Sequence, residues 1–261
     1  MSDPEGAALV TGASAGIGRA LAREFAAGGY DLVVVARRKE QLTVLAEELD
    51  AEHGVDIHAI PMDLAEPGAA EKLYDAVDER EVQIDALVNN VGIGAYGRFH
   101  ETDLDRELAQ LRLNVELPMH LTKLYLPEMI ERDEGSILNV ASLAAFFPGP
   151  RMAGYYASKA YLLQLSEALA TELRGTGVSV TTLCPGPVRT EFQERAGMED
   201  TLVGSRFIHS REDVAKAGYR GAMNGRLVVV PGIGMRLLSF LARLSPRWLQ
   251  RRITARANAD R

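Results

Sequence analysis

The stretch ALVTGASAGIGRALAREF, residues 8–25, places a glycine-rich turn between a short apolar run and a helix-forming segment. The run ALVT is typical of a buried β-strand. Gly12, Gly16 and Gly18 follow it, and glycine lets the turn adopt crowded dihedral angles and lets a pyrophosphate approach the backbone. The unpaired N–H groups that begin the next helix favour an anion. The stretch therefore predicts a strand, a phosphate-binding turn and a helix, although a turn with only a structural role has the same pattern.

Short apolar runs rich in β-forming residues recur along the chain, and amphipathic stretches such as 39–54 and 70–80 separate most of them. This alternation indicates a parallel sheet with helices on both faces. We expect one doubly wound α/β domain over residues 1–231, with a seven-stranded, mostly parallel sheet and an irregular insertion around 186–210. The predicted strands are 8–11, 31–36, 57–62, 84–90, 136–142, 178–185 and 226–232.

Composition excludes several classes of protein. The chain has 261 residues and a net charge of −7, which disfavours general nucleic-acid binding. Its single cysteine, Cys184, permits no intrachain disulfide and no cysteine-rich metal site. The start MSDPEGAALV lacks the features of a secretory signal, and no apolar run is long enough to span a bilayer. A cytoplasmic protein without a metal is the expectation.

The end of the second predicted strand bears on the cofactor. An NAD site has an acidic residue roughly 20 positions after the glycines, whereas this chain has Ala36, Arg37 and Arg38 there. Two guanidinium groups would hold a 2′-phosphate, and Ser14 could add a hydrogen bond. The pattern favours NADP(H) over NAD(H); a solvated basic turn is the alternative.

The segment 153–175 has the apolar period of a helix and contains Tyr155, Tyr156 and Lys159. Tyr155 lies four residues before the lysine, and Tyr156 lies three before it. Both spacings bring side chains close on a helix. Spacing alone therefore leaves open which tyrosine acts with Lys159.

Four motifs together resemble the short-chain dehydrogenase/reductase superfamily. They are TGASAGIG (11–18), NNVG (89–92), Ser142, and Tyr155 with Lys159. They follow the order and spacing of that family over roughly residues 7–190, with Val91 in place of its usual alanine. The resemblance implies a single-domain Rossmann fold and an oxidoreductase that interconverts a carbonyl compound and an alcohol.

The resemblance also implies roles for individual residues. Tyr155 would be the catalytic tyrosine, Lys159 would lower its pKa and hold the nicotinamide ribose, and Ser142 would hold the substrate oxygen. Asn114 would support a water-mediated proton path to the lysine. An ammonium about 4 Å from a phenol, at an effective dielectric near 20, supplies roughly 4 kcal/mol, enough to lower the phenol pKa by about three units. Tyr156 is expected to pack beside the substrate cavity.

The remaining cofactor contacts also come from the resemblance. They are expected at Gly12, Ser14, Gly16, Ile17, Gly18, Arg37, Arg38, Asp63, Leu64, Asn90, Gly92, Tyr155, Lys159, Pro185, Gly186, Val188 and Thr190. Asp63 would touch the adenine amino group, and Val188 and Thr190 the carboxamide. Asn89 and Asn90 could instead have a purely structural role and tie adjacent strands together. Cys184 is expected to be a buried apolar residue.

The predicted substrate site lies beyond the carboxyl ends of the strands. Its candidate residues are Ile93, Tyr96, Leu143, Phe146, Phe147, Met152 and Phe192, with Arg151 as the one obvious charge. This lining favours a lipophilic ketone, although several of these residues could equally fill the core. The segment 189–207 is a candidate lid.

Residues 232–261 carry seven arginines and one acidic residue, a local charge of +6. Leu237, Leu241, Leu244 and Trp248 lie near one face of an amphipathic pattern, which Pro246 should interrupt. Three interpretations remain open for this extension: a subunit contact, a cover over the pocket, or a peripheral membrane contact.

We expect an NADP(H)-dependent oxidoreductase acting on a lipophilic carbonyl or alcohol, such as a 3-oxoacyl or steroid-like compound, assembled as a homodimer or homotetramer. The alternatives are a non-catalytic dinucleotide sensor and a membrane-surface protein acting through its C-terminal helix.

Overall fold

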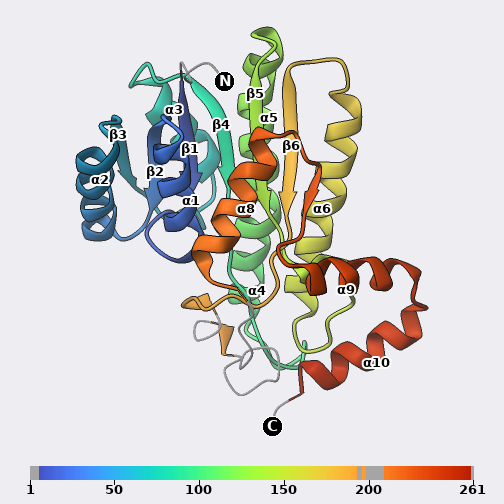
Figure 1. The fold of residues 1–261 in the computed structure, drawn as a ribbon. Helices are drawn as coiled ribbons and strands as arrows, with labels where there is room; N and C mark the ends of the chain where they lie inside the picture. Colours follow the sequence, from blue (N-terminus) through green and yellow to red (C-terminus); the bar gives the residue numbers. More distant parts are fainter. Residues whose placement is uncertain (1–5, 193–195, 198–208, 260–261) are drawn as a thin grey trace.

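In the computed structural model, which describes residues 6–192, 196–197 and 209–259, the strands form one seven-stranded sheet (Figure 1). Its order is β3-β2-β1-β4-β5-β6-β7, and every described strand pair is parallel. The strands are β1 (Ala7–Thr11), β2 (Asp31–Ala36), β3 (Ile57–Pro61), β4 (Ile84–Asn89), β5 (Gly135–Val140), β6 (Val178–Leu183) and β7 (Val228–Val229). The predicted doubly wound sheet is confirmed, but its last strand is much shorter than expected.

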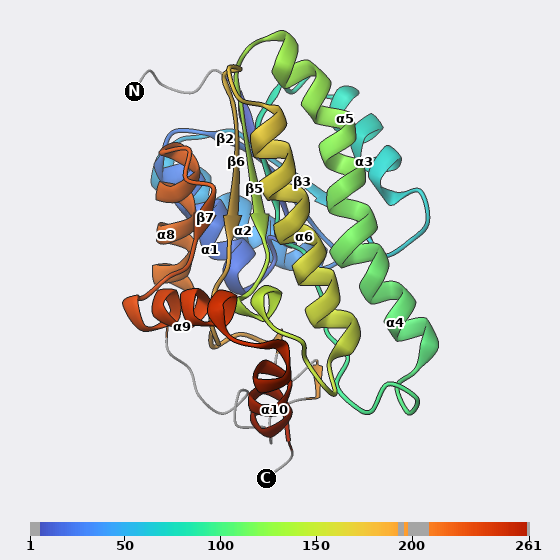
Figure 2. The same ribbon diagram turned by 90° about the vertical axis from the view of Figure 1, so that its right-hand side faces the viewer.

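Helices cover both faces of the sheet, which is seen nearly edge-on in Figure 2. The helices α1 (Gly16–Ala27), α2 (Lys39–His53) and α8 (Arg211–Met223) pack on one face. The helices α3 (Ala69–Asp78), α5 (Leu117–Glu131) and α6 (Ala153–Glu172) pack on the other. The helix α4 (Leu104–Leu111) continues into α5 through a π-helical turn, Arg112–Glu116. Both sides of each central strand are thus buried, which explains their continuous apolar sequences.

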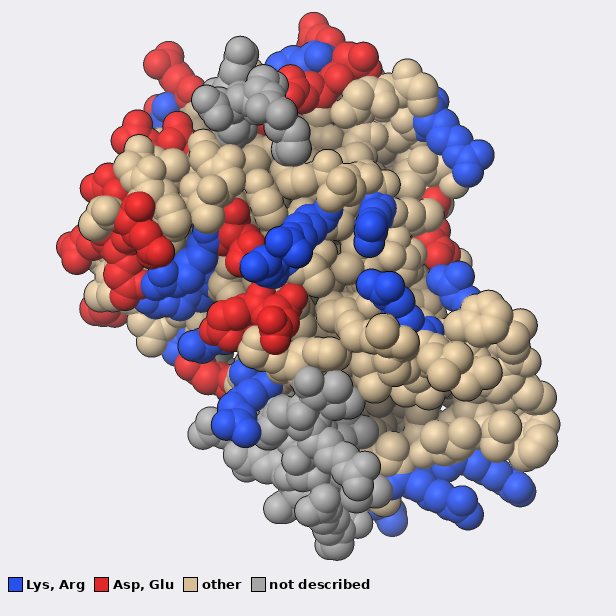
Figure 3. All heavy atoms as spheres, in the orientation of Figure 1, with Lys and Arg blue, Asp and Glu red and all other residues tan. Residues whose placement is uncertain are grey.

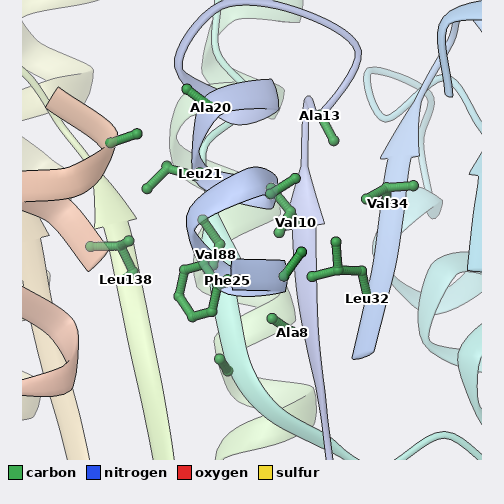
Figure 4. Close-up of a cluster of buried hydrophobic side chains, with 14 of the residues drawn as sticks. Ala8, Val10, Ala13, Ala20, Leu21, Phe25, Leu32, Val34, Val88 and Leu138 are labelled. Atoms are coloured by element: carbon green, nitrogen blue, oxygen red, sulfur yellow. The ribbon is translucent and has the colours of Figure 1, made fainter. Parts of the chain in front are cut away.

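The first helix anchors the glycine turn to the core. Leu21 and Phe25 of α1 are fully buried, and Figure 4 shows both among Val10, Val88 and Leu138 of the sheet. Full burial of such a side chain stabilises the fold by about 1.5–3 kcal/mol. This packing fixes the first turn of α1 against the end of β1, where the glycines lie.

The C-terminal extension forms two helices, α9 (Ile233–Leu244) and α10 (Arg247–Ala257). Pro246 separates them, as predicted from its missing N–H group. The helix α9 packs on the 3₁₀ turn Leu143–Phe146 after β5 and on Gly186 after β6, where an added Cβ would lie 2.9 Å from Met235 Sδ. The extension therefore lies at the carboxyl ends of the strands (Figure 1).

The predicted insertion and lid, 186–210 and 189–207, fall largely outside the described residues. The part that the structure describes runs to Phe192 and resumes at Ala196–Gly197 and His209. No helix of the described part of the chain has both the length and the apolar character needed to cross a bilayer.

Candidate active site

A cavity of about 950 Å³ opens at the carboxyl ends of the strands. Its wall comes from the turns after β1 to β6, from α6, and from α9 and α10. All seventeen residues predicted to contact the cofactor line it, and so do three of the four predicted catalytic residues: Ser142, Tyr155 and Lys159. The fourth, Asn114, is buried behind the wall. Residues far apart in the sequence thus meet in one site.

The glycine turn needs glycine for two different reasons. Gly12 and Gly16 have positive φ angles of 71° and 58°, which side-chain-bearing residues rarely adopt. At Gly18, an added Cβ would lie 2.3 Å from the Gly12 carbonyl oxygen and from Asn90 Nδ2. The turn therefore folds tightly against β4.

The first turn of α1 faces this cavity with its main-chain donors available. Its N-cap, Ala15, supplies no side-chain hydrogen bond, and no acidic residue lies in the first turn. Gly16 and Ile17 line the cavity. An uncapped helix start beside glycines suits an anionic phosphate.

The two arginines predicted to read a 2′-phosphate have different partners. Arg38 donates a hydrogen bond to Ser14 Oγ at 3.2 Å and pairs with Glu191 at 3.2 Å. Arg37 is 65% exposed and pairs with Asp63 at 3.7 Å. Arg38 and Ser14 thus meet beside the glycine turn, as the phosphate hypothesis requires. Glu191 is an acidic competitor for the same guanidinium that sequence reasoning missed.

The two asparagines after β4 do different things. Asn89 is buried away from the cavity and donates to Asn139 Oδ1 at 2.9 Å, which ties β4 to β5. Asn90 lines the cavity, and its side chain donates to the Thr11 carbonyl at 2.8 Å. The structural alternative therefore describes Asn89, whereas Asn90 both ties the glycine turn to β4 and faces the cavity.

Gly92, Asn114 and Lys159 come together at the centre of the site. A Cβ added at Gly92 would lie 3.0 Å from Asn114 Oδ1 and 3.2 Å from Lys159 Nζ. Asn114 lies in the π-helical turn. Its side-chain oxygen accepts a hydrogen bond from the Ile93 N–H, and its side-chain nitrogen donates to the Ile93 carbonyl and, at 3.0 Å, to Ser158 Oγ. Lys159 Nζ donates to the Val140 carbonyl at 2.9 Å. The bond to Val140 holds the lysine against the end of β5.

Ser142 and Tyr155 form the polar pair of the site. Ser142 follows β5, and its Oγ accepts a hydrogen bond from the Ala144 N–H at 3.1 Å. A hydrogen bond from Ser142 to the Tyr155 side chain lowers the pKa of the phenol, but burial raises it more, and the resulting pKa is about 12. The two hydroxyls thus meet in the cavity.

This raised pKa is opposite in direction to the lowered pKa expected for Tyr155. Lys159 Nζ lies 5.9 Å from the Tyr155 ring centroid, and burial lowers the pKa of the ammonium itself to about 8. Desolvation of the buried phenol is the largest cause of its raised pKa. Tyr155 is therefore protonated at neutral pH in the protein alone.

Most of the predicted substrate-site residues line the cavity. Those that do are Ile93, Leu143, Phe147, Met152 and Phe192, together with Tyr156 as the resemblance implied. Cys184 is fully buried, as predicted. Asp63, Arg37 and Arg38 lie at the phosphate end, whereas the lining residues expected at the substrate end are mainly apolar.

Three expectations about that end are wrong. Phe146 packs into a core cluster, with the Arg243 guanidinium 5.3 Å from its ring. Tyr96 turns its hydroxyl towards α10, and Arg151 donates to that hydroxyl at 3.0 Å instead of lining the cavity. The charge that does line this part of the wall is Arg106, which donates to the Gly94 carbonyl at 3.0 Å.

The C-terminal helices complete the wall. Met235 and Leu238 of α9 and Ile253, Thr254 and Ala257 of α10 line the cavity. This placement agrees with the interpretation of the extension as a cover over the pocket. The sequence signalled an amphipathic segment but not which of its residues face inward.

Two polar residues at one end of α10 fix it to the loop before α6. Thr254 Oγ1 donates to the Pro148 carbonyl at 2.6 Å, and Asn258 Nδ2 donates to the Pro150 carbonyl at 3.0 Å. The Tyr156 hydroxyl donates to Asn258 Oδ1 at 3.3 Å, and the Tyr96 hydroxyl donates to the Asn258 main-chain oxygen at 2.7 Å. Sequence reasoning missed this set of contacts, because nothing in the pattern pairs residues a hundred positions apart.

The cavity suits a nicotinamide dinucleotide. It runs without interruption from Arg38 past the glycine turn to Lys159. A Cβ added at Gly16 would meet only the Thr190 side chain, at 3.4 Å, so the main chain there is open to a pyrophosphate. No cluster of three or more metal-ligating His, Cys, Asp or Glu side chains occurs among the residues the structure describes.

Comparison with known proteins agrees with this geometry. Residues 6–200 match the short chain dehydrogenase family. The chain is 38% identical over 186 residues to sulfoacetaldehyde reductase 2 of Chromohalobacter salexigens, covering 70% of this chain and 73% of the relative. It is 33% identical over 211 residues to the 7beta-hydroxysteroid dehydrogenase of Clostridium sardiniense, covering 81% of this chain and 80% of the relative.

Solved structures share the fold. A short-chain dehydrogenase from Sphingobium yanoikuyae in complex with NADPH superposes with a TM-score of 0.82 at 30% identity, covering 92% of this chain and 93% of that one. A short chain dehydrogenase/reductase from Burkholderia phymatum in complex with NAD gives a TM-score of 0.81 at 24% identity, covering 92% and 94%, which shows the fold alone. The chain belongs to the short chain dehydrogenase family and is an oxidoreductase of that type with a fold that binds a nicotinamide dinucleotide.

Proposed function

We propose that this protein is an NADP(H)-dependent reductase or dehydrogenase that interconverts a lipophilic ketone and its secondary alcohol. The observation that carries the proposal is the meeting of Ser142, Tyr155 and Lys159 in a cavity whose far end is mainly apolar. A dinucleotide sensor would need no proton donor there.

The protein would contribute the proton and the positioning. Ser142 would hold the substrate oxygen near Tyr155, whose hydroxyl is protonated at neutral pH because its pKa is about 12. The product alkoxide has a conjugate acid that resembles water, whose pKa is about 15.7, so proton transfer from Tyr155 to it is downhill. A bound reduced nicotinamide supplies the hydride.

Lys159 would act on the cofactor side of Tyr155. Its ammonium is held by the Val140 carbonyl and lies within reach of the ring face of Tyr155. A cation there stabilises the phenolate left after proton transfer. The buried position makes that stabilisation stronger than it would be in water.

The preference for NADP(H) is supported by Arg38 and Ser14, which lie together at the phosphate end. The absence of an acidic residue at Ala36 to Arg38 removes the usual partner of an unphosphorylated ribose. Glu191 works against this preference, since it neutralises Arg38.

A lipophilic substrate is supported by the apolar lining and by the match to a 7beta-hydroxysteroid dehydrogenase. The match to a sulfoacetaldehyde reductase points to a small anionic aldehyde as the competing substrate class. Arg106 is the lining charge that could serve such a substrate.

A carbonyl panel followed through NADPH absorbance tests the proposal. The panel should contain bulky apolar ketones, steroid-like ketones and sulfoacetaldehyde, each measured with NADPH and with NADH. We expect turnover of the apolar ketones with NADPH. Dinucleotide binding without turnover of any compound would favour the sensor, and preferred turnover of sulfoacetaldehyde would overturn the lipophilic assignment.

A further inference from the structure

The helix α9 is amphipathic, but its apolar side faces solvent. Ser239 and Ala242 are buried beneath it, whereas the large apolar residues lie on the opposite side. With Trp248 of α10 they form a surface that we call the C-terminal ridge: Ile233 (84% exposed), Leu237 (57%), Phe240 (58%), Leu241 (50%), Leu244 (68%) and Trp248 (54%). A group of large exposed apolar residues on neighbouring helices is typical of an interaction site.

Arginines accompany the ridge. Residues 232–259 contain six arginines and no lysine or acidic residue. Among the described residues, Arg243 is the only one of the six with an ion pair, to Glu167 at 3.2 Å. The Arg252 guanidinium lies 5.6 Å from the Trp248 ring centroid. Figure 3 shows basic side chains along the edge of the molecule where α10 lies.

The rest of the molecule has the opposite charge. The whole chain carries −7 and residues 232–261 carry +6, so residues 1–231 carry −13. The acidic side chains in Figure 3 gather at the other end of the view. Near a negatively charged surface, this charge asymmetry orients the molecule so that the C-terminal ridge faces that surface.

The two helices that carry the ridge also contribute exposed apolar residues to the cavity wall. Leu238 is 40% exposed and Ile253 is 53% exposed, and both line the cavity wall. A surface that binds the ridge would therefore contact the same two helices that line the cavity.

We propose that the C-terminal ridge docks this protein onto an anionic lipid bilayer, with α9 lying in the interface and the arginines of α10 on the lipid headgroups. Apolar residues with a tryptophan and flanking arginines are the features of helices that lie on membranes. A second copy of the chain fits less well. A two-fold symmetric contact through the ridge would place the same arginines against each other.

Vesicle co-sedimentation of the full chain tests the proposal without any measurement of turnover. The vesicles are phosphatidylcholine alone, or phosphatidylcholine with about 30% phosphatidylglycerol. We expect binding to the anionic vesicles that weakens as salt is added, because salt screens the arginines. The proposal stands independently of the proposed function, since a bound but inactive protein would still confirm docking.

Two variants probe the two parts of the surface. Leu237→Ser with Leu241→Ser and Leu244→Ser should lower the partition coefficient on the order of 100-fold, because three half-exposed leucines lose their apolar burial. Arg251→Gln with Arg252→Gln should lower it about 30-fold and flatten the salt dependence. None of these residues lines the cavity.

The matched control is Val44→Ser with Ile130→Ser, which changes apolar residues of similar exposure, 47% and 43%, on other helices. It should bind like the unmodified protein. Thermal unfolding of every variant checks that it is folded. If the leucine variant does not fold, the binding of the arginine variant tests the proposed docking.

Sedimentation velocity in the absence of lipid separates the alternative. A dimer that the leucine substitutions convert to a monomer, together with no vesicle binding, would overturn the proposal in favour of a second copy. The proposal would also be overturned if the unmodified protein did not bind anionic vesicles. It would be overturned as well if the leucine variant and the arginine variant both bound them as strongly as the unmodified protein does.

Discussion

Replacing Asn258 with alanine would remove the side chain that fixes the end of α10 to the cavity wall. This side chain is fully buried, donates to the Pro150 carbonyl at 3.0 Å and accepts from the Tyr156 hydroxyl at 3.3 Å. Each lost hydrogen bond costs about 1–1.5 kcal/mol, so α10 should lose about 2–3 kcal/mol of docking free energy. The Tyr96 hydroxyl bonds the main chain of Asn258 and is retained, so the helix stays in place.

Hydrogen exchange of the α10 amides measures this loss directly. Because each 1.4 kcal/mol is a factor of ten, exchange of α10 should become roughly 30 to 140 times faster, while the strands keep their protection. If the enzyme accepts a bulky apolar ketone, its KM should rise, because the wall that contacts it is less often closed.

The matched control is Asn224→Ala at the exposed end of α8, which should leave α10 exchange unchanged. Equal exchange of α10 in the Asn258 variant and the unmodified protein would refute the reasoning. It would mean that apolar packing alone holds α10 against the loop.

Three further predictions concern the glycine turn, the phosphate end and the buried lysine. Gly18→Ala should lower the free energy of unfolding by about 1–3 kcal/mol in denaturant titration, since the new Cβ would lie 2.3 Å from the Gly12 oxygen. Gly54→Ala is its control: the new Cβ would have no atom within 4 Å, so this variant would show the effect of backbone strain alone at a φ of 66°. Arg38→Ala should raise the Kd of NADPH about 10- to 100-fold by fluorescence titration and leave that of NADH nearly unchanged; a larger effect of Arg37→Ala would contradict the assignment of the 2′-phosphate to Arg38. Burial lowers the pKa of Lys159 to about 8 from 10.5, so its folded-state charge opposes folding below pH 8 and this cost disappears as pH rises towards 10.5. Lys159→Met should therefore remove a rise in stability of up to about 3 kcal/mol between pH 7 and pH 10, and an unchanged pH profile would contradict the shift.

Much of the fold could be predicted from local patterns. The strand, turn and helix at residues 8–25 are encoded by neighbouring residues, and all seven strands were expected near their observed positions. The last strand was overestimated, because the apolar run at 226–232 continues into the loop before α9.

The candidate site could be assembled from motifs, but the directions of its side chains could not. Tyr96 and Phe146 follow strands β4 and β5 as substrate-site residues should, yet one turns towards α10 and the other into the core. Asn258 and Thr254 carry no local signal, because their partners lie more than a hundred residues away. The pKa of Tyr155 was predicted in the wrong direction, since burial depends on the whole fold.

The central claim is that the hydroxyl of Tyr155, and not that of its neighbour, delivers the proton to the substrate. Tyr156 is the matched control that the chain itself offers, because it lines the same cavity and precedes the same lysine. Single-turnover oxidation of bound NADPH by a ketone measures the chemical step for Tyr155→Phe and Tyr156→Phe. We expect the first to be slower by about 10²- to 10⁴-fold with unchanged NADPH affinity, and the second to stay within about tenfold. Equal rates for the two variants would contradict the account.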